Sequence, residues 1–168
     1  MKISKTILAS LLFALAGVAS AQQTAQPARP PAQAPQAAQQ LTPAQQALVA
    51  RQDAEMAKAA AWVVQNVDKN NAAEVWRGAS GVAKSVVTEQ AFVAQITQDR
   101  QNLGAVQQRQ QMSISRSVYP AGGQIPAGNY VNVAYATKFA DAAQPVRELV
   151  SFHLDDDKTW RVSGYSVR

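Results

Sequence analysis

The sequence predicts one α+β domain, in which three N-terminal helices pack on a curved, four-stranded antiparallel sheet. Between residues 42 and 104, apolar residues recur at spacings of three and four, the period of helices with one buried face. After Gly104 the period falls to two, the alternation of strands that place one face on a core. The links between the strands are short, which favours a meander. Helices and sheet can bury their apolar faces only against each other, so we expect a cone with the helices in its hollow.

The first helix is expected to open the folded part, 42–168, and to run to about Val67. Thr42 is an N-cap residue, Pro43 occupies the first helical position, and Gln45 completes a capping box. An apolar stripe at helical spacing is formed by Met56, Ala59, Ala60, Val63 and Val67.

Two shorter helices are expected before the sheet. Asn71 and Glu74 resemble a capping box for the second helix, which stops in the segment 78–81. The third helix begins at Thr88 and stops at Gly104. Its inward residues are Phe92, Ile96 and Leu103.

Each of the first three strands is expected to present one apolar face to the core. The residues on that face are Val106, Met112, Ile114 and Val118, then Val131, Val133, Tyr135, Thr137 and Phe139, then Val146, Val150, Phe152 and Leu154. The fourth strand, 159–167, follows a turn at 155–158. There Trp160 and Gly164 share a parity and are interpreted as structural residues, and we expect a helix to cross closely over Gly164.

The first 21 residues are interpreted as a cleavable signal peptide. Lys2 and Lys5 precede a short apolar run, 7–18, and small residues at 19–21 predict cleavage after Ala21. A retained membrane anchor is the alternative, but a spanning helix needs about 20 apolar residues. We therefore expect no membrane span in the mature chain, and a location in the periplasm or outside the cell.

Residues 22–41 consist almost entirely of Gln, Ala and Pro, so we expect a disordered tail. A solubilising tail is the simplest interpretation, and a spacer or a ligand for a partner is the alternative.

Composition excludes several classes of function. The chain contains no cysteine, which excludes disulfides and a lipid-modified cysteine. Without Lys2 and Lys5, the 16 Lys and Arg become 14 against 11 Asp and Glu, so the mature net charge is +3. The positive residues are scattered singly, whereas nucleic-acid binding needs them clustered on one face. No nucleic-acid partner is expected.

Several short motifs follow one another as in a family of exported bacterial proteins. They are Ala61-Trp62-Val63, Trp76-Arg77-Gly78-Ala79-Ser80, Val87-Thr88 with Phe92-Val93, Leu103-Gly104 with Arg109, Gly128-Asn129-Tyr130, Phe139-Ala140, Glu148, and the ending Trp160-Arg161-Val162-Ser163-Gly164-Tyr165. From about Ala54 to Arg168 the chain resembles the family called domain of unknown function 4019. The resemblance implies a fold similar to the cystatin-like, nuclear transport factor 2-like cone, and it implies no activity.

Glu148 is the residue of greatest interest for function. It shares the core-facing parity of its strand, and an unpaired buried carboxylate is costly. We therefore expect it to be paired, to lie near an open rim, or to titrate differently from a free carboxylate. A pair with Arg109 or Arg161 is the structural interpretation, and a general acid or base or a ligand anchor is the functional one. The candidate pocket residues are Glu148, Tyr135, Phe92 and Trp62, although such aromatic residues more often form core.

No metal site, cofactor or other catalytic residue is expected. His153 is the only histidine, and the acidic run 155–157 lacks the spacing of a calcium loop. We expect a surface histidine and a solvated hairpin turn. Ser80 lacks the surroundings of a nucleophile and is expected to cap a tight helical turn.

Three functions remain open. The first is a non-enzymatic binding or interaction module of the cell envelope. It would use the hollow of the cone or the open sheet face to bind a small apolar ligand or an envelope protein, or to form a homodimer. The alternative is a small enzyme of isomerase or hydrolase type that uses Glu148 in an aromatic-lined pocket. The third is a structural spacer that depends on the 22–41 tail.

Overall fold

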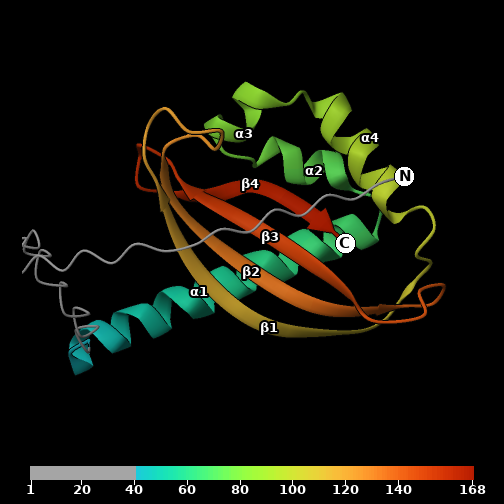
Figure 1. Cartoon of the computed structure of the whole chain (residues 1–168), viewed down its shortest axis with the longest axis horizontal. Coiled ribbons are helices and arrows are strands. Elements are labelled where there is room, and N and C mark those ends of the chain that lie inside the picture. Colours follow the sequence, from blue (N-terminus) through green and yellow to red (C-terminus); the bar gives the residue numbers. More distant parts are fainter. Residues whose placement is uncertain (1–40) are drawn as a thin grey trace, which may run out of the picture. The chain divides into compact units, whose positions relative to one another are not determined.

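The computed structural model describes residues 41–168, in which four helices precede four strands (Figure 1). The helices are α1 (Pro43–Asp68), α2 (Ala72–Arg77), α3 (Gly81–Val86) and α4 (Glu89–Arg100). The strands are β1 (Val106–Tyr119), β2 (Gly128–Phe139), β3 (Val146–Leu154) and β4 (Trp160–Val167). The predicted α+β class, with helices on a four-stranded antiparallel sheet, is confirmed. The predicted signal peptide, and all of the Gln/Ala/Pro-rich tail before residue 41, lie outside the described residues.

Helix α1 begins at the predicted capping box. The Gln45 amide donates to the Thr42 hydroxyl at 3.3 Å, and the Thr42 amide donates to the Gln45 side chain at 2.8 Å. This reciprocal pair satisfies N–H groups that a helix start would otherwise leave unpaired. The buried residues of α1 are Met56, Ala60, Val63, Val64 and Val67. The N-terminal half of α1 therefore adds little to the core, and it extends past the strands (Figure 1).

Ser80 starts a helix that the sequence pattern did not predict. Its hydroxyl accepts a hydrogen bond from the Ala83 amide at 3.1 Å, so the prediction that Ser80 is a cap is confirmed, but the cap opens α3. The Ser80 amide also donates to the Val162 carbonyl at 2.8 Å, and Ala79 forms a parallel bridge with Val162. These contacts fasten the start of α3 to the β4 edge of the sheet.

The four strands form the predicted meander, in the order β1-β2-β3-β4, but β1 contains two irregularities. They lie between Val106 and Gln108 and between Gln111 and Ser113. At each of them one extra residue is inserted, so the residues that follow point to the opposite face from the one that strict alternation predicts. Met112 is the bulged residue and is 61% exposed. The prediction that it faces the core is therefore wrong, and the reversed parity instead places Arg109 on the core face, opposite Thr137.

Val118 is a second residue of β1 that the prediction placed wrongly in the core. It pairs with Asn129 at the end of the strand, beside the β1–β2 loop, and it is 75% exposed. By contrast, all five residues predicted to face the core from β2 are buried: Val131, Val133, Tyr135, Thr137 and Phe139.

One face of the sheet carries the core. Side chains from all four helices pack against β2, β3 and β4 there, and Trp76 and Phe92 contact each other with their ring centroids 5.6 Å apart. The opposite side of the sheet, which we call the open face, is bordered by α3 and by the β1–β2 loop.

Gly164 belongs to the open face, which corrects the expectation that a helix crosses closely over it. Because of a bulge in the β3–β4 pairing, Gly164 and Val162 point to opposite faces of the sheet, and Gly164 pairs with Ser151. A Cβ atom at Gly164 would contact only the Ser151 Cβ, at 4.0 Å. Trp160 is partly buried against the core, in agreement with the prediction of a structural role.

Candidate functional site

A row of small residues crosses the open face through all four strands. Ser115 pairs with Asn132, Asn132 with Ser151, and Ser151 with Gly164. Cross-strand partners present their side chains on the same face, and in this row the side chains are short or absent. The row therefore forms a shallow depression in the sheet surface. Gly164, which has no side chain, leaves the most space in it.

Walls around this floor enclose a hollow of about 400 Å³, which we call the open-face hollow. Helix α3 supplies Val82, Ala83 and Val86, and the β1–β2 loop supplies Ile125 and Pro126. Val86 is 69% exposed and Ile125 is 43% exposed, so apolar side chains stand at the mouth of the hollow. Its volume lies within the range of small-molecule sites.

Hydrogen bonds fix part of the hollow and leave donors available in it. The Tyr130 hydroxyl donates to the Pro126 carbonyl at 2.9 Å and so ties the loop to β2. The Ser151 hydroxyl donates to the Asn132 Oδ1 at 2.7 Å, which leaves the Asn132 amide nitrogen free within residues 41–168. The Ser163 hydroxyl is buried without a hydrogen-bond partner in the same part of the chain.

Arg147 supplies the charge of the open-face hollow. No acidic residue lines the hollow, and Arg147 is exposed and forms no ion pair within the described residues. Arg147 and Arg168 exchange two backbone hydrogen bonds, each of 2.9 Å, so their side chains extend from the same face. This end of the hollow is therefore electropositive.

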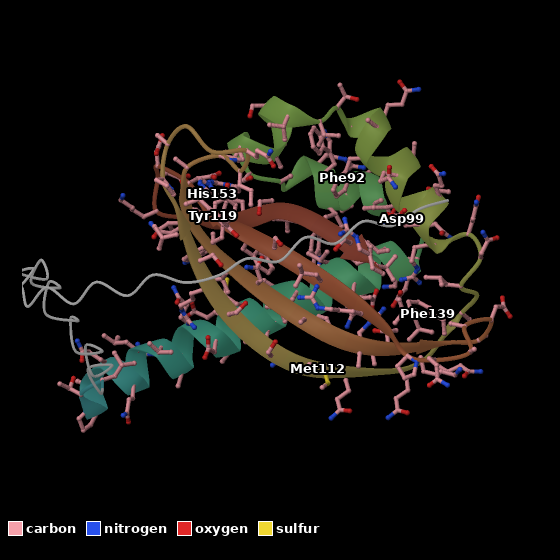
Figure 2. The ribbon with its side chains drawn as sticks, viewed as in Figure 1. Phe92, Asp99, Met112, Tyr119, Phe139 and His153 are labelled. Carbon is pink, nitrogen blue, oxygen red and sulfur yellow. The ribbon has the colours of Figure 1, made fainter. Side chains whose placement is uncertain are left out.

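An aromatic group closes the other end. The Tyr119 and Tyr130 ring centroids are 5.4 Å apart, and the Tyr130 and His153 centroids are 4.9 Å apart, both in edge-on contact. Figure 2 shows Tyr119 and His153 together at the end of the sheet beside the β1–β2 loop, with Phe139 toward the opposite end.

His153 is buried, contrary to the prediction of a surface residue. It is 6% exposed because its ring packs beneath Tyr130 and against Gly128, whose φ of 145° and missing Cβ let the ring approach. Its Nδ1 lies 2.8 Å from the Asp155 carboxylate, and its Nε2 has no hydrogen-bond partner within residues 41–168. The prediction was wrong because the residues of the neighbouring strand, Gly128 and Tyr130, cover the His153 ring.

A second groove, of about 700 Å³, surrounds the turn between β3 and β4. In this groove Arg161 pairs with Asp155 at 3.1 Å and with Asp157 at 2.7 Å, whereas Asp156 and Lys158 form no ion pair within residues 41–168. The hydrogen bond from Arg161 lowers the pKa of the exposed Asp157 carboxyl. Burial alone would raise the pKa of Asp155, but hydrogen bonds from His153, the Gly81 amide and Arg161 lower it. Although this groove is larger than the open-face hollow, it is lined by the charged residues of an exposed hairpin turn, whereas the hollow combines apolar walls with a single charged residue, so we favour the hollow as the candidate site.

Glu148 lies at the centre of a buried ion cluster on the core face. It has no exposed surface and accepts five hydrogen bonds, two of them from Arg109, at 2.6 and 3.2 Å. The other donors are Arg100 at 3.2 Å, Tyr165 at 2.6 Å, and Thr137. Pairing with an arginine was predicted and Arg109 is that partner, whereas Arg161 pairs elsewhere.

Asp68 completes the cluster. It contacts Arg100 at 2.9 Å and Arg109 at 2.8 Å, so two carboxylates balance two guanidinium groups. Burial alone would raise the pKa of Asp68, but the hydrogen bonds and charges of Arg109 and Arg100 outweigh it and lower that pKa. Burial and the Glu148 charge both raise the pKa of Tyr165, which keeps its hydroxyl protonated as a donor. The cluster therefore cross-links α1, α4 and all four strands, which suits a structural role.

The structure does not gather the four predicted pocket residues around a cavity. Tyr135 lies opposite Glu148 and is buried, with its hydroxyl unpartnered within residues 41–168. Phe92 packs on Trp76 in the core, and Trp62 is 44% exposed on α1. None of the four lines the open-face hollow, the turn groove, or a third pocket between α2 and α4. Their role in binding stays a prediction.

Sequence reasoning missed the residues of the open-face hollow. The alternation in β2 and β3 placed Asn132 and Ser151 on the sheet face opposite the core, but it did not single them out as residues of a site. The available signal was the Ser115, Asn132 and Ser151 series of small polar residues, but aligning them requires the register between strands.

No helix within residues 41–168 is long and apolar enough to cross a membrane. No group of three or more His, Cys, Asp or Glu in that range is arranged to hold a metal ion.

Comparison with known proteins identifies a family. A search among curated proteins gives no match to the chain. Residues 58–165, well over half of the chain, match the family described as "Protein of unknown function (DUF4019)". The match covers all of the elements that build the ion cluster and the open-face hollow, apart from the first part of α1 and the last residues of β4. The chain therefore belongs to the DUF4019 family.

Proposed function

We propose that this protein is a non-enzymatic binding module that holds a small organic molecule in the open-face hollow. The observation that carries the proposal is a floor of small residues, Ser115, Asn132, Ser151 and Gly164, beneath apolar walls from α3 and the β1–β2 loop. Sites of this kind combine an apolar lining with a few convergent polar groups. The Asn132 amide and the Arg147 guanidinium are such groups.

The core face offers less support for a site, because its polar groups already have partners. Glu148 has no exposed surface, and its two oxygens share five hydrogen bonds. A general acid or base needs access to the atom with which it exchanges a proton. We therefore place ligand binding on the open face, and no observation favours the enzymatic alternative.

We also propose that the module functions in the cell envelope after removal of the signal peptide. The basic start, the short apolar run and the small residues before Gln22 support export. N-terminal sequencing of the protein from a periplasmic fraction should begin at Gln22. A cytoplasmic protein that retains Met1 would contradict this part of the proposal.

Native mass spectrometry of the protein purified from its own host tests the binding function. In Gly164→Leu the new side chain should occupy the hollow, since a Cβ there meets only the Ser151 Cβ, at 4.0 Å. Ser113→Leu is the matched control, because Ser113 is an exposed residue of β1 that does not line the hollow. We expect a small-molecule adduct on the parent and on Ser113→Leu that is lost in Gly164→Leu. Bare protein in all three samples, or equal adducts in all three, would contradict the proposal.

A further inference from the structure

Charge and apolar character are separated along the open-face hollow. Arg147, Leu149 and Ser151 point to the same face of β3, and Arg147 lies about 13 Å from Ser151 at roughly 3.3 Å per residue. Arg168 adds a second positive charge beside Arg147. Beyond Leu149, the hollow is bounded by α3 and by the β1–β2 loop, whose Val86 and Ile125 are apolar and exposed.

Two polar groups of the hollow, the Arg147 guanidinium and the Asn132 amide nitrogen, can only donate hydrogen bonds to a ligand, whereas the hydroxyls that line it can donate or accept. A guanidinium group has five N–H donors and no acceptor, and the side-chain nitrogen of Asn132 is likewise a donor. The Ser163 hydroxyl can donate or accept and has no partner within residues 41–168. Because no acidic side chain lines the hollow, a ligand there meets donors and the positive charge of Arg147.

On the basis of the proposed function, we infer that the ligand is an amphipathic carboxylate. Its carboxylate lies at Arg147 and Arg168, where planar guanidinium groups form paired, charge-assisted hydrogen bonds. Its apolar chain passes over Leu149 and beneath Val86 and Ile125.

Isothermal calorimetry with three probes of equal chain length tests the class of ligand. Octanoate carries the carboxylate, octanol is neutral, and octylamine is positively charged. We expect octanoate to bind the protein at least about tenfold more tightly than octanol, the scale of a charge-assisted hydrogen bond, and octylamine to bind more weakly than either. Octanoate binding should weaken as salt concentration rises, since Arg147 is exposed.

Arginine variants separate the charge from the hollow itself. Arg147→Gln should weaken octanoate binding by about tenfold or more and leave octanol binding unchanged. Arg168→Gln should cause a smaller loss, and Arg51→Gln, which alters an exposed arginine of α1 outside the hollow, should cause none. Urea unfolding of each variant confirms that the fold is retained.

The outcomes distinguish this inference from the proposed function. Equal binding of octanoate and octanol, unchanged in Arg147→Gln but lost in Gly164→Leu, would overturn the carboxylate inference and preserve a ligand-binding hollow. Failure of octanoate to bind at all would also overturn the inference, and the adduct measurement with Gly164→Leu would then decide the proposed function separately.

Discussion

Replacement of Glu148 by glutamine removes one charge from the ion cluster while the shape of the side chain is retained. The parent carboxylate accepts two hydrogen bonds from Arg109 and one each from Arg100, Thr137 and Tyr165. The glutamine amide nitrogen is itself a donor, so it would face the N–H and O–H groups that donate to the carboxylate in the parent protein. Arg100 and Arg109 would also share Asp68 as their only carboxylate partner within residues 41–168.

The expected cost follows from burial. Removal of one partner from a buried ion pair destabilises a protein by about 3–5 kcal/mol. Glu148 is fully buried, and the side chains of Arg100 and Arg109 are each 14% exposed, so solvent screens this cluster little. We therefore expect Glu148→Gln to lower the free energy of unfolding by about 3–5 kcal/mol.

Urea unfolding at pH 7, followed by tryptophan fluorescence, measures this change as a lower midpoint at an unchanged slope. Glu55→Gln is the matched control, because Glu55 is exposed on α1, and it should change stability by less than about 0.5 kcal/mol. Tyr165→Phe removes one hydrogen bond to Glu148 and should lower the free energy of unfolding by about 1.5–3 kcal/mol. This variant provides a second test if Glu148→Gln does not fold. A loss below about 1 kcal/mol in Glu148→Gln, or none in Tyr165→Phe, would refute the reasoning.

Three further predictions concern other parts of the fold. The lowered pKa of Asp68 stabilises the folded state above the unfolded value of about 3.9, and this stabilisation is lost as pH falls through the folded pKa, so stability measured by urea unfolding should decline from about pH 5 to pH 2. In Asp68→Asn that decline should be shallower, and an identical pH profile would contradict the assignment. Gly128→Ala should cost at least about 2 kcal/mol, because φ is 145° and the new Cβ would collide with the His153 ring. The same substitution in a His153→Ala background should cost less, and equal costs in both backgrounds would show that the ring is not responsible. Trp160→Ala should cost about 2–3 kcal/mol in thermal or urea unfolding, below the value for a fully buried tryptophan, because Trp160 is only partly buried; unchanged stability would assign it to an exposed surface instead.

Local signals in the sequence were sufficient for most elements of the fold. The Thr42 capping box, the stripe from Met56 to Val67 and the period of two in β2 each depend on neighbouring residues alone, and each was predicted correctly. The bulge at Met112 was not predictable in this way, because a bulge is defined by the partner strand. The burial of His153 depends on a ring, Tyr130, that reaches it across strands.

The two polar regions of the molecule were predictable to different degrees. Parity placed Glu148 on the core face, and the cost of an unpaired buried carboxylate then required a partner such as Arg109. Asp68 and Arg100 were missed because they join from helices, and only tertiary packing brings them to the sheet. The open-face hollow depends on the register that aligns Ser151 with its neighbours, which no single strand encodes.

An NMR titration of the protein with octanoate, observed at each backbone amide, tests the location of the site most directly. We expect the amide shifts to concentrate on the floor and wall of the open-face hollow, at Asn132, Ser151, Gly164 and Val82, and to be lost in Gly164→Leu. Shifts that centre instead on the residues around Glu148 would place the ligand on the core face and contradict the account.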